Sequence, residues 1–450
     1  MKADRLILVA AFILCLPLVT PKIRGADEIE YFSYLHSLVF DHDLEFGNEY
    51  QYFYDHDPKG LEGFRKTFLE GREAATGHHI NFGPIGTALL WSPFYLAAHA
   101  LVLLMARLGM HVVPDGLSAP YQAAVCYASV LYGYVGLAML NERLRAFFPG
   151  RAALLATLGV FLGTPLLYYL TLAPGFSHAV SLFTVMLVLE LFFRYRKSAG
   201  LMGWVAVGAA GGLSGLVREQ DALFLVIPLA DLGCRAYRER EISRGLLRIG
   251  AVLGTAFVFF LPQRLVYHSL NGSFGPSHLV ARKLSFLSPH FFDVLVDPGH
   301  GLFVWSPLVF VSVLGLLRFA WRSRDLLGAF FLLAFLLQVW INGSLESWTQ
   351  AGAFGSRRFL SATPLFAFGL ASLAEMALVR LGQAATSVIL ALFVWWNVSL
   401  MVQFGLKLMD RQRLEWPRVA TNQVLEVPPR LLRVTRLFFT NRERLVHEAP

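Results

Sequence analysis

The chain has 450 residues, of which 56% are hydrophobic and only 16% are charged. A soluble domain carries about 25% charged residues, so this composition leaves too few charges to cover a water-facing surface. Apolar runs recur along nearly the whole length, and most are long enough to cross about 30 Å of hydrocarbon. The composition therefore excludes a soluble enzyme and predicts an integral membrane protein.

The net charge of +8 comes from Lys and Arg residues that cluster in short loops between the apolar runs. This pattern is the positive-inside bias of membrane proteins, so it indicates topology rather than binding to nucleic acid. The three cysteines, Cys15, Cys126 and Cys234, lie in or beside apolar runs. They indicate neither a disulfide framework nor a cysteine-based metal site.

The apolar runs predict an all-α, polytopic membrane protein with about eleven transmembrane helices and interface helices in the first outer loop. A membrane domain of residues 1–405 is then followed by a basic C-terminal tail, 406–450. The first run lacks a small-residue cleavage site, so we expect an uncleaved helix rather than a secretory signal. The predicted spans lie near 6–22, 119–140, 152–172, 177–195, 200–217, 221–234, 246–268, 301–320, 326–342, 359–379 and 384–405.

The basic loops place the N-terminus in the cytoplasm and the loop 23–118 on the outer side of a plasma or inner membrane. Residues 83–118 must then cross an even number of times. We therefore expect 83–108, with Pro84 and Pro93, to lie along the outer interface or to re-enter. A helical hairpin is the competing interpretation. The tail is placed outside as well, where anionic lipid head groups would attract its arginines.

The first outer loop opens with the acidic pair Asp27 and Glu28. A carboxylate at that position can take a proton from an acceptor hydroxyl. The alternative is an acid at a helix start, which the helix dipole favours. Further along the loop, His79 follows a second histidine and precedes Asn81. The histidine pair suggests a metal site but lacks a full ligand set, and interface residues are the alternative.

The other outer loops add cations and aromatic residues. His178 begins a span, either as a proton shuttle or as a hydrogen-bonded residue at a helix start. Arg357 and Arg358 lie at the outer mouth of a span, against the positive-inside bias. Arginine pairs suit phosphate groups through bidentate hydrogen bonds, although lipid head groups are bound by the same physics. The remaining candidates for substrate binding are Arg218, Glu346 and Trp348.

The chain resembles the C-type superfamily of membrane glycosyltransferases, which includes the protein O-mannosyltransferases and the aminoarabinose transferases of lipid A. The resemblance covers roughly residues 5–380. It is carried by the acidic pair followed by Tyr31, by the segment Asn81-Phe82-Gly83-Pro84, and by the polar loop before His178. The short paired spans around Arg218 and the late segment Gly355-Ser356-Arg357-Arg358-Phe359 also fit.

This resemblance implies transfer of a sugar from a polyprenyl-phosphate donor to a lipid, glycan or protein acceptor at the outer membrane face, with inversion at the anomeric carbon. Asp27 would be the general base, and Glu28 would support it or help to bind an ion. Arg357, Arg358 or Arg218 would stabilise the leaving phosphate. Several members carry an acid in the second outer loop, where this chain has His178. This departure puts a metal site in doubt and is compatible with a proton or phosphate role for His178. A divalent cation stays an open alternative, and no cofactor is assigned.

Two other classes of function fit a basic outer face. A transporter or flippase of lipid-linked glycans should carry charged residues near mid-membrane. The chain has few candidates for this role, namely the charged residues Glu190 and Arg264 and the polar residue Gln263. The second alternative is a non-enzymatic membrane scaffold. Such a scaffold would not need Asp27, Glu28 and Arg357 together.

Overall fold

The computed structural model describes residues 2–197, 200–287, 290–323, 325–350 and 352–441. The protein is 74% helical, and the described residues contain no strand, which confirms the all-α class. Among them, five helices are long and apolar enough to cross a membrane, and three shorter apolar helices accompany them. These helices support membrane association, whereas the number of eleven spans remains a prediction. The five are Gly86–Arg107, Ala119–Arg145, His178–Tyr195, Ile242–Asn271 and Arg357–Gly405.

The chain divides into two compact units. Unit 1 comprises Met1–Val9, Leu140–Tyr168 and Ser285–Pro450, and unit 2 comprises Ala10–Met139 and Tyr169–Leu284. The predicted domain 1–405 contributes to both units, and the end of the predicted tail, 442–450, lies outside the described residues. Three helices contribute to both units: α1 (Lys2–Cys15), α6 (Ala119–Arg145) and α8 (Leu166–Thr171).

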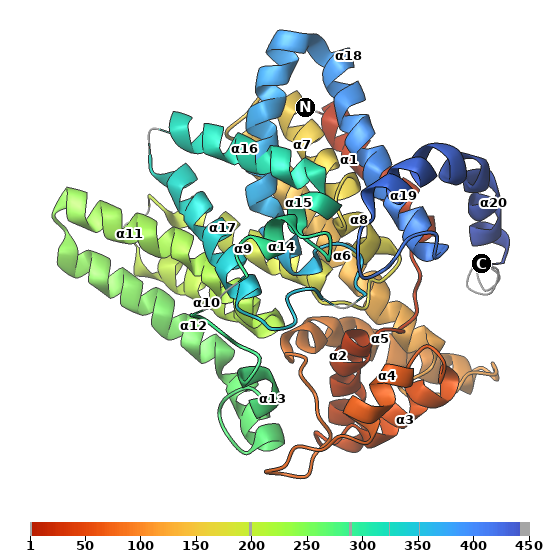
Figure 1. The fold of residues 1–450 in the computed structure, drawn as a ribbon. Helices are drawn as coiled ribbons and strands as arrows, with labels where there is room; N and C mark the ends of the chain where they lie inside the picture. The colour runs from red at the N-terminus through yellow and green to blue at the C-terminus, as the bar shows by residue number, and fades with distance from the viewer. Residues whose placement is uncertain (1, 198–199, 288–289, 324, 351, 442–450) are drawn as a thin grey trace. The chain divides into compact units, whose positions relative to one another are not determined.

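Unit 1 is built around α16, α18 and α7, which pack on one another. Figure 1 shows α18 as two limbs joined by a sharp turn. The turn is at Gly382, whose φ of 78° is readily adopted only by glycine, and it separates the two predicted spans 359–379 and 384–405. The helices of this unit are α7 (Gly150–Leu162), α14 (Asp293–Val296), α15 (Leu302–Trp305), α16 (Pro307–Arg322), α17 (Leu327–Gly343), α18 (Thr363–Gly405), α19 (Trp416–Thr421) and α20 (Val427–Thr440).

Unit 2 contains residues 23–118, which were predicted to form the first outer loop, and with them the acidic pair. Short helices α2 and α3 carry many buried aromatic residues, and α2 packs against α5. The helices of this unit are α2 (Ala26–His36), α3 (Gly47–His56), α4 (Glu62–Phe64), α5 (Gly86–Arg107), α9 (His178–Tyr195), α10 (Leu201–Val217), α11 (Val226–Glu239), α12 (Ile242–Asn271) and α13 (His278–Ala281).

Helix α5 differs from the broken segment expected for 83–108. It runs without interruption for 22 residues through Pro93 and is long enough to cross a membrane. A proline inside a helix lacks the N–H that would bond the carbonyl four residues earlier, here Leu89. The hydroxyl of Ser92 donates to that carbonyl instead, at 2.8 Å. The Ser92 hydroxyl therefore satisfies the carbonyl that Pro93 leaves without a backbone donor, a compensation known from membrane helices.

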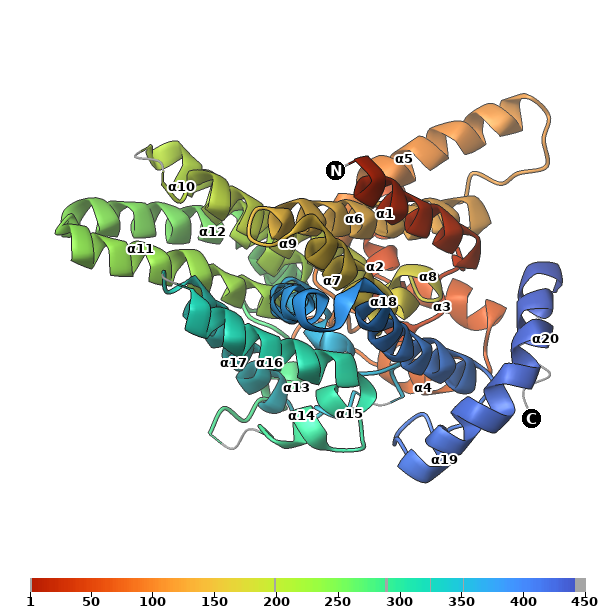
Figure 2. The same ribbon diagram turned by 90° about the horizontal axis from the view of Figure 1, so that it is seen from above.

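Helices α10, α11 and α12 lie side by side in both views (Figures 1 and 2). Glycines allow α10 to approach α12 closely, because a Cβ on Gly208 would lie 2.4 Å from the carbonyl oxygen of Val252. A Cβ on Gly212 would lie 2.4 Å from the carbonyl oxygen of Ala256. Such small-residue contacts are the usual means of helix association in lipid.

We expect Gly212→Ala to destabilise the protein by about 1–3 kcal/mol, because the added methyl would force α10 and α12 apart. Gly254→Ala is the matched control, since no atom of another element lies near its Cβ position. That variant should gain about 0.5–1 kcal/mol from improved helix propensity. Unfolding of both variants in detergent micelles measures the difference, and equal stabilities would contradict close packing at Gly212.

Candidate functional site

The acidic pair begins helix α2, and its second member stabilises the helix N-terminus. Oε2 of Glu28 accepts the backbone N–H groups of Arg24 and Gly25, each at 2.7 Å. The Glu28 side chain is buried, and its Oε1 has no hydrogen-bond partner among the described residues. Burial raises the pKa of Glu28 to about 7, although the two backbone hydrogen bonds oppose this shift. Glu28 thus matches the helix-start interpretation and positions the acid beside it.

Asp27 is half-buried at the same helix start, one turn before Tyr31. Burial raises the pKa of Tyr31 to about 12. The negative charge of Asp27 adds to this shift, and the positive charge of Arg218 opposes it. Both charges therefore act on the Tyr31 hydroxyl, which relates an acid at the start of α2 to a cation at the end of α10.

Ser177 and His178 connect this group. The Ser177 hydroxyl donates to the Tyr31 oxygen at 3.3 Å and accepts from Nη1 of Arg218 at 3.4 Å. Nη1 of Arg218 also lies 3.2 Å from Nδ1 of His178, whose ring is buried against Tyr169. Nη2 of Arg218 donates to Gln220, whereas its buried Nε has no partner among the described residues. One N–H of this guanidinium thus still lacks an acceptor.

The predicted binding residues His79 and Asn81 occupy structural positions in the same unit. Asn81 donates to the carbonyl of Glu30 at 3.1 Å and accepts from the backbone N–H of Gly83 at 2.8 Å. These bonds tie the segment after the histidine pair to α2. His79 is buried beside Glu45, and burial lowers the pKa of its ring. The polar contacts of Asn81 and His79 are thus made to other residues of the protein.

The remaining predicted binding residues belong to unit 1. The guanidinium of Arg358 donates to the carbonyl and the hydroxyl of Ser347, both at 3.1 Å. Arg357 begins a six-residue 3-10 helix that leads into α18, and its charge acts on His300. Glu346 is exposed, and the Trp348 ring stacks on His290. The structure thus groups these four residues around the loop 343–358.

A cavity of about 330 Å³ lies beside the acidic pair in unit 2. Its polar lining includes Lys22, Arg24, Tyr52, His56 and Asp57. Cavities of about 300–1,000 Å³ are typical of small-molecule sites. Asp27 does not line the cavity. The lining residue nearest to it in the sequence is Arg24, three positions earlier.

Two features of unit 2 were absent from the sequence-based prediction. Ser177 links Tyr31 to Arg218 but carries no distinguishing sequence signal. His36, Asp41 and Glu49 form a cluster of donor atoms that lie within 4.8 Å of one another. The only sequence signal for this cluster is an Asp and a Glu within thirteen residues of a His, and their uneven spacing fits no metal-binding motif.

The site thus combines a helix-start acid, a tyrosine hydroxyl, a serine and an arginine in one unit of an apolar helical protein. No protein-family model and no curated protein matches the chain.

Proposed function

We propose that this protein is a membrane glycosyltransferase that moves a sugar from a polyprenyl-phosphate donor to an acceptor hydroxyl or amine. The observation that carries the proposal is the hydrogen-bonded group in which Ser177 joins the Tyr31 hydroxyl to the guanidinium of Arg218, one helical turn from Asp27. A base and an anion-binding cation in one group suit a reaction that releases a phosphate.

In the proposed reaction, the acceptor oxygen or nitrogen attacks the anomeric carbon as the bond from that carbon to the phosphate oxygen breaks. The phosphate oxygen leaves with the bonding electron pair, and the configuration of the sugar inverts. Asp27 takes the proton of the acceptor. The guanidinium of Arg218 stabilises the charge that develops on the polyprenyl phosphate.

Other residues have supporting roles in this proposal. Glu28 holds the N-terminal turn of α2 through two backbone hydrogen bonds and so positions Asp27. His178 and Ser177 orient the guanidinium of Arg218. Arg357 and Arg358 belong to unit 1 and stay predicted phosphate-binding residues of that unit. The polar cavity lined by Lys22 and Arg24 is space that a polar head group can occupy in the same unit.

The test is transfer of radiolabelled sugar from polyprenyl-phosphate sugars to membrane lipid and protein acceptors by the purified protein. The assay should be run in detergent and in sealed vesicles, because an enzyme transfers label in both whereas a flippase needs a sealed bilayer. We expect label on an acceptor in both preparations. Movement of labelled donor across the vesicle membrane without any transfer would overturn the proposal in favour of a transporter.

Replacing Arg218 by glutamine should lower kcat/KM for the donor by about 10²-fold or more, because removal of one charged contact to a developing anion costs about that much. Arg72→Gln is the matched control, since Arg72 is exposed in the same unit and its guanidinium donates to the carbonyls of Leu69 and Gly71. Steady-state kinetics with varied donor measure the effect. A change of equal size in both variants would contradict a specific role for Arg218.

A further inference from the structure

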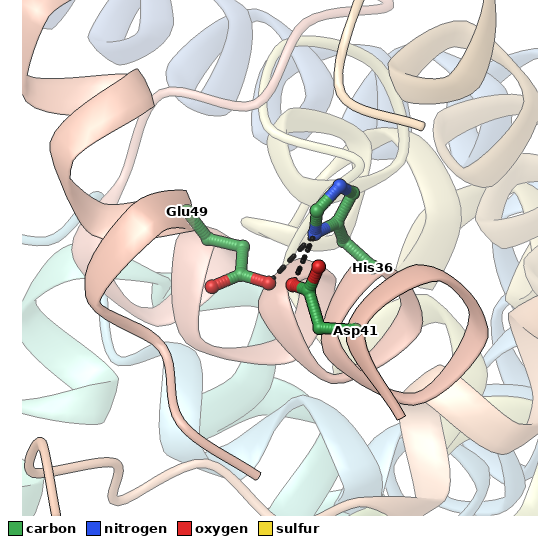
Figure 3. A group of neighbouring side chains, drawn as sticks. All are labelled: His36, Asp41 and Glu49. Carbon is green, nitrogen blue, oxygen red and sulfur yellow. Dashed lines mark hydrogen bonds and ion pairs between the residues drawn. The ribbon is translucent and has the colours of Figure 1, made fainter. Parts of the chain in front are cut away.

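His36, Asp41 and Glu49 bring three potential metal ligands together where α2 turns into α3 (Figure 3). His36 is the last residue of α2, Asp41 ends the helical turn Ser37–Asp41 that follows, and Glu49 lies in the first turn of α3. Nδ1 of His36 lies 2.8 Å from Oε1 of Glu49 and 3.2 Å from Oδ2 of Asp41. Two carboxylates thus converge on one nitrogen of the imidazole.

The charges of this cluster are not balanced by the protein. The Glu49 side chain is fully buried, and its Oε2 has no hydrogen-bond partner among the described residues. No Lys or Arg in the described part of the chain forms an ion pair with Asp41 or Glu49, so His36 is their one ionic partner there. A protonated His36 would still leave one excess negative charge. Burying such a charge is costly unless a cation offsets it.

The geometry matches an inner coordination sphere. A metal with bonds of about 2.0–2.2 Å holds neighbouring ligand atoms roughly 3 Å apart, which is the spacing of the His36 nitrogen from each carboxylate oxygen, and all three atoms lie within 4.8 Å of one another. The side chain of Asp41 is 31% exposed, so an ion can reach the cluster from solvent. The amide of Asn48 donates to Oδ2 of Asp41 at 2.8 Å, which is the kind of outer contact that orients a ligand.

We propose that His36, Asp41 and Glu49 bind one divalent transition-metal cation, of the class to which Mn²⁺ and Zn²⁺ belong. One imidazole and two carboxylates form a mixed nitrogen and oxygen donor set, which suits these ions better than Ca²⁺. Nine residues of α2 separate His36 from Asp27, which corresponds to about 14 Å along the helix. The ion therefore fixes α2 to α3 rather than touching the reacting atoms, and the proposal does not rest on the sugar-transfer reaction.

The test is a titration of the full chain in detergent with Mn²⁺, after treatment with a chelator, followed by electron paramagnetic resonance. We expect one bound equivalent that Zn²⁺ displaces, and a higher unfolding midpoint in the presence of the metal. Asp41→Asn should weaken binding more than about 10-fold, because even the loss of an outer contact costs 10–100-fold. The partly exposed position of Asp41 makes this variant the least disruptive to folding, and Glu49→Gln provides a second variant.

Glu45→Gln is the matched control, because Glu45 pairs with His78 and His79 in the other cluster of histidine and carboxylate in this unit. That variant should bind the metal as the native chain does. Failure of the native chain to bind Mn²⁺ or Zn²⁺ would overturn the proposal and leave a protonated His36 as the only cation. Loss of binding in Glu45→Gln with unchanged binding in Asp41→Asn would also overturn it, since the ion would then lie at His78 and His79.

Discussion

Replacing Asp27 by asparagine should lower the rate of sugar transfer by about 10²–10⁴-fold, the contribution of a positioned general base. The amide keeps the shape of the side chain but cannot accept the proton of the acceptor. The loss should appear in kcat, because Asp27 acts on the acceptor proton in the transition state rather than in donor binding. The measurement is transfer of label under saturating donor, with insertion of the variant verified first.

The control for this variant is Asp55→Asn. Asp55 is an exposed acid of the same loop that accepts a hydrogen bond from Gln51 and lies outside the proposed site. Its replacement should leave the transfer rate within about twofold of the native rate, since surface changes of this kind have small effects. If the enzyme is active and Asp27→Asn transfers as fast as Asp55→Asn, the base is another residue and the class of enzyme survives.

Replacing Glu28 by glutamine should make the protein more stable at pH 8 than the native chain, by as much as about 3 kcal/mol. Burial raises the pKa of Glu28 from 4.5 to about 7 in the folded protein. The folded state thus holds its proton more tightly than the unfolded state does. Glutamine has the shape of the protonated acid, can accept the same two backbone N–H groups and does not ionise.

The sign of the pH dependence follows from this raised pKa. The native contribution of Glu28 is greatest below about pH 4.5 and is lost as the pH rises to about 7. The difference in unfolding free energy between Glu28→Gln and the native chain should therefore grow between pH 4.5 and pH 8. Other titrating groups cancel in this difference, because both proteins contain them.

Chemical unfolding in detergent at the two pH values measures this difference. Glu142→Gln is a suitable comparison, because its carboxylate is partly exposed and pairs with Arg5. That variant should show no such growth between pH 4.5 and pH 8, since the exposed ion pair persists across this range. A pH-independent difference for Glu28→Gln would mean that the buried carboxyl is not protonated in the folded state.

The sequence determined most of the helix positions because apolar runs and their boundaries are local properties. The span predicted at 177–195 is helix α9, and that at 200–217 is α10, each within one residue. Likewise, the spans predicted on either side of 380–383 are the two limbs of α18. The acids Asp27 and Glu28 were placed correctly at a helix start, because the helix dipole and the unpaired N–H groups favour acids there.

Only the tertiary structure decided which side chains meet. Ser177 and Tyr31 are separated by 146 positions, and Arg218 lies another 41 beyond Ser177. No local pattern relates such positions, since their contact depends on how α2, α9 and α10 pack. The same holds for His36 and Glu49, which the turn between two short helices brings within 2.8 Å. Hydrophobic periodicity carries information about burial, whereas side-chain contacts between distant segments depend on packing that the sequence pattern does not encode.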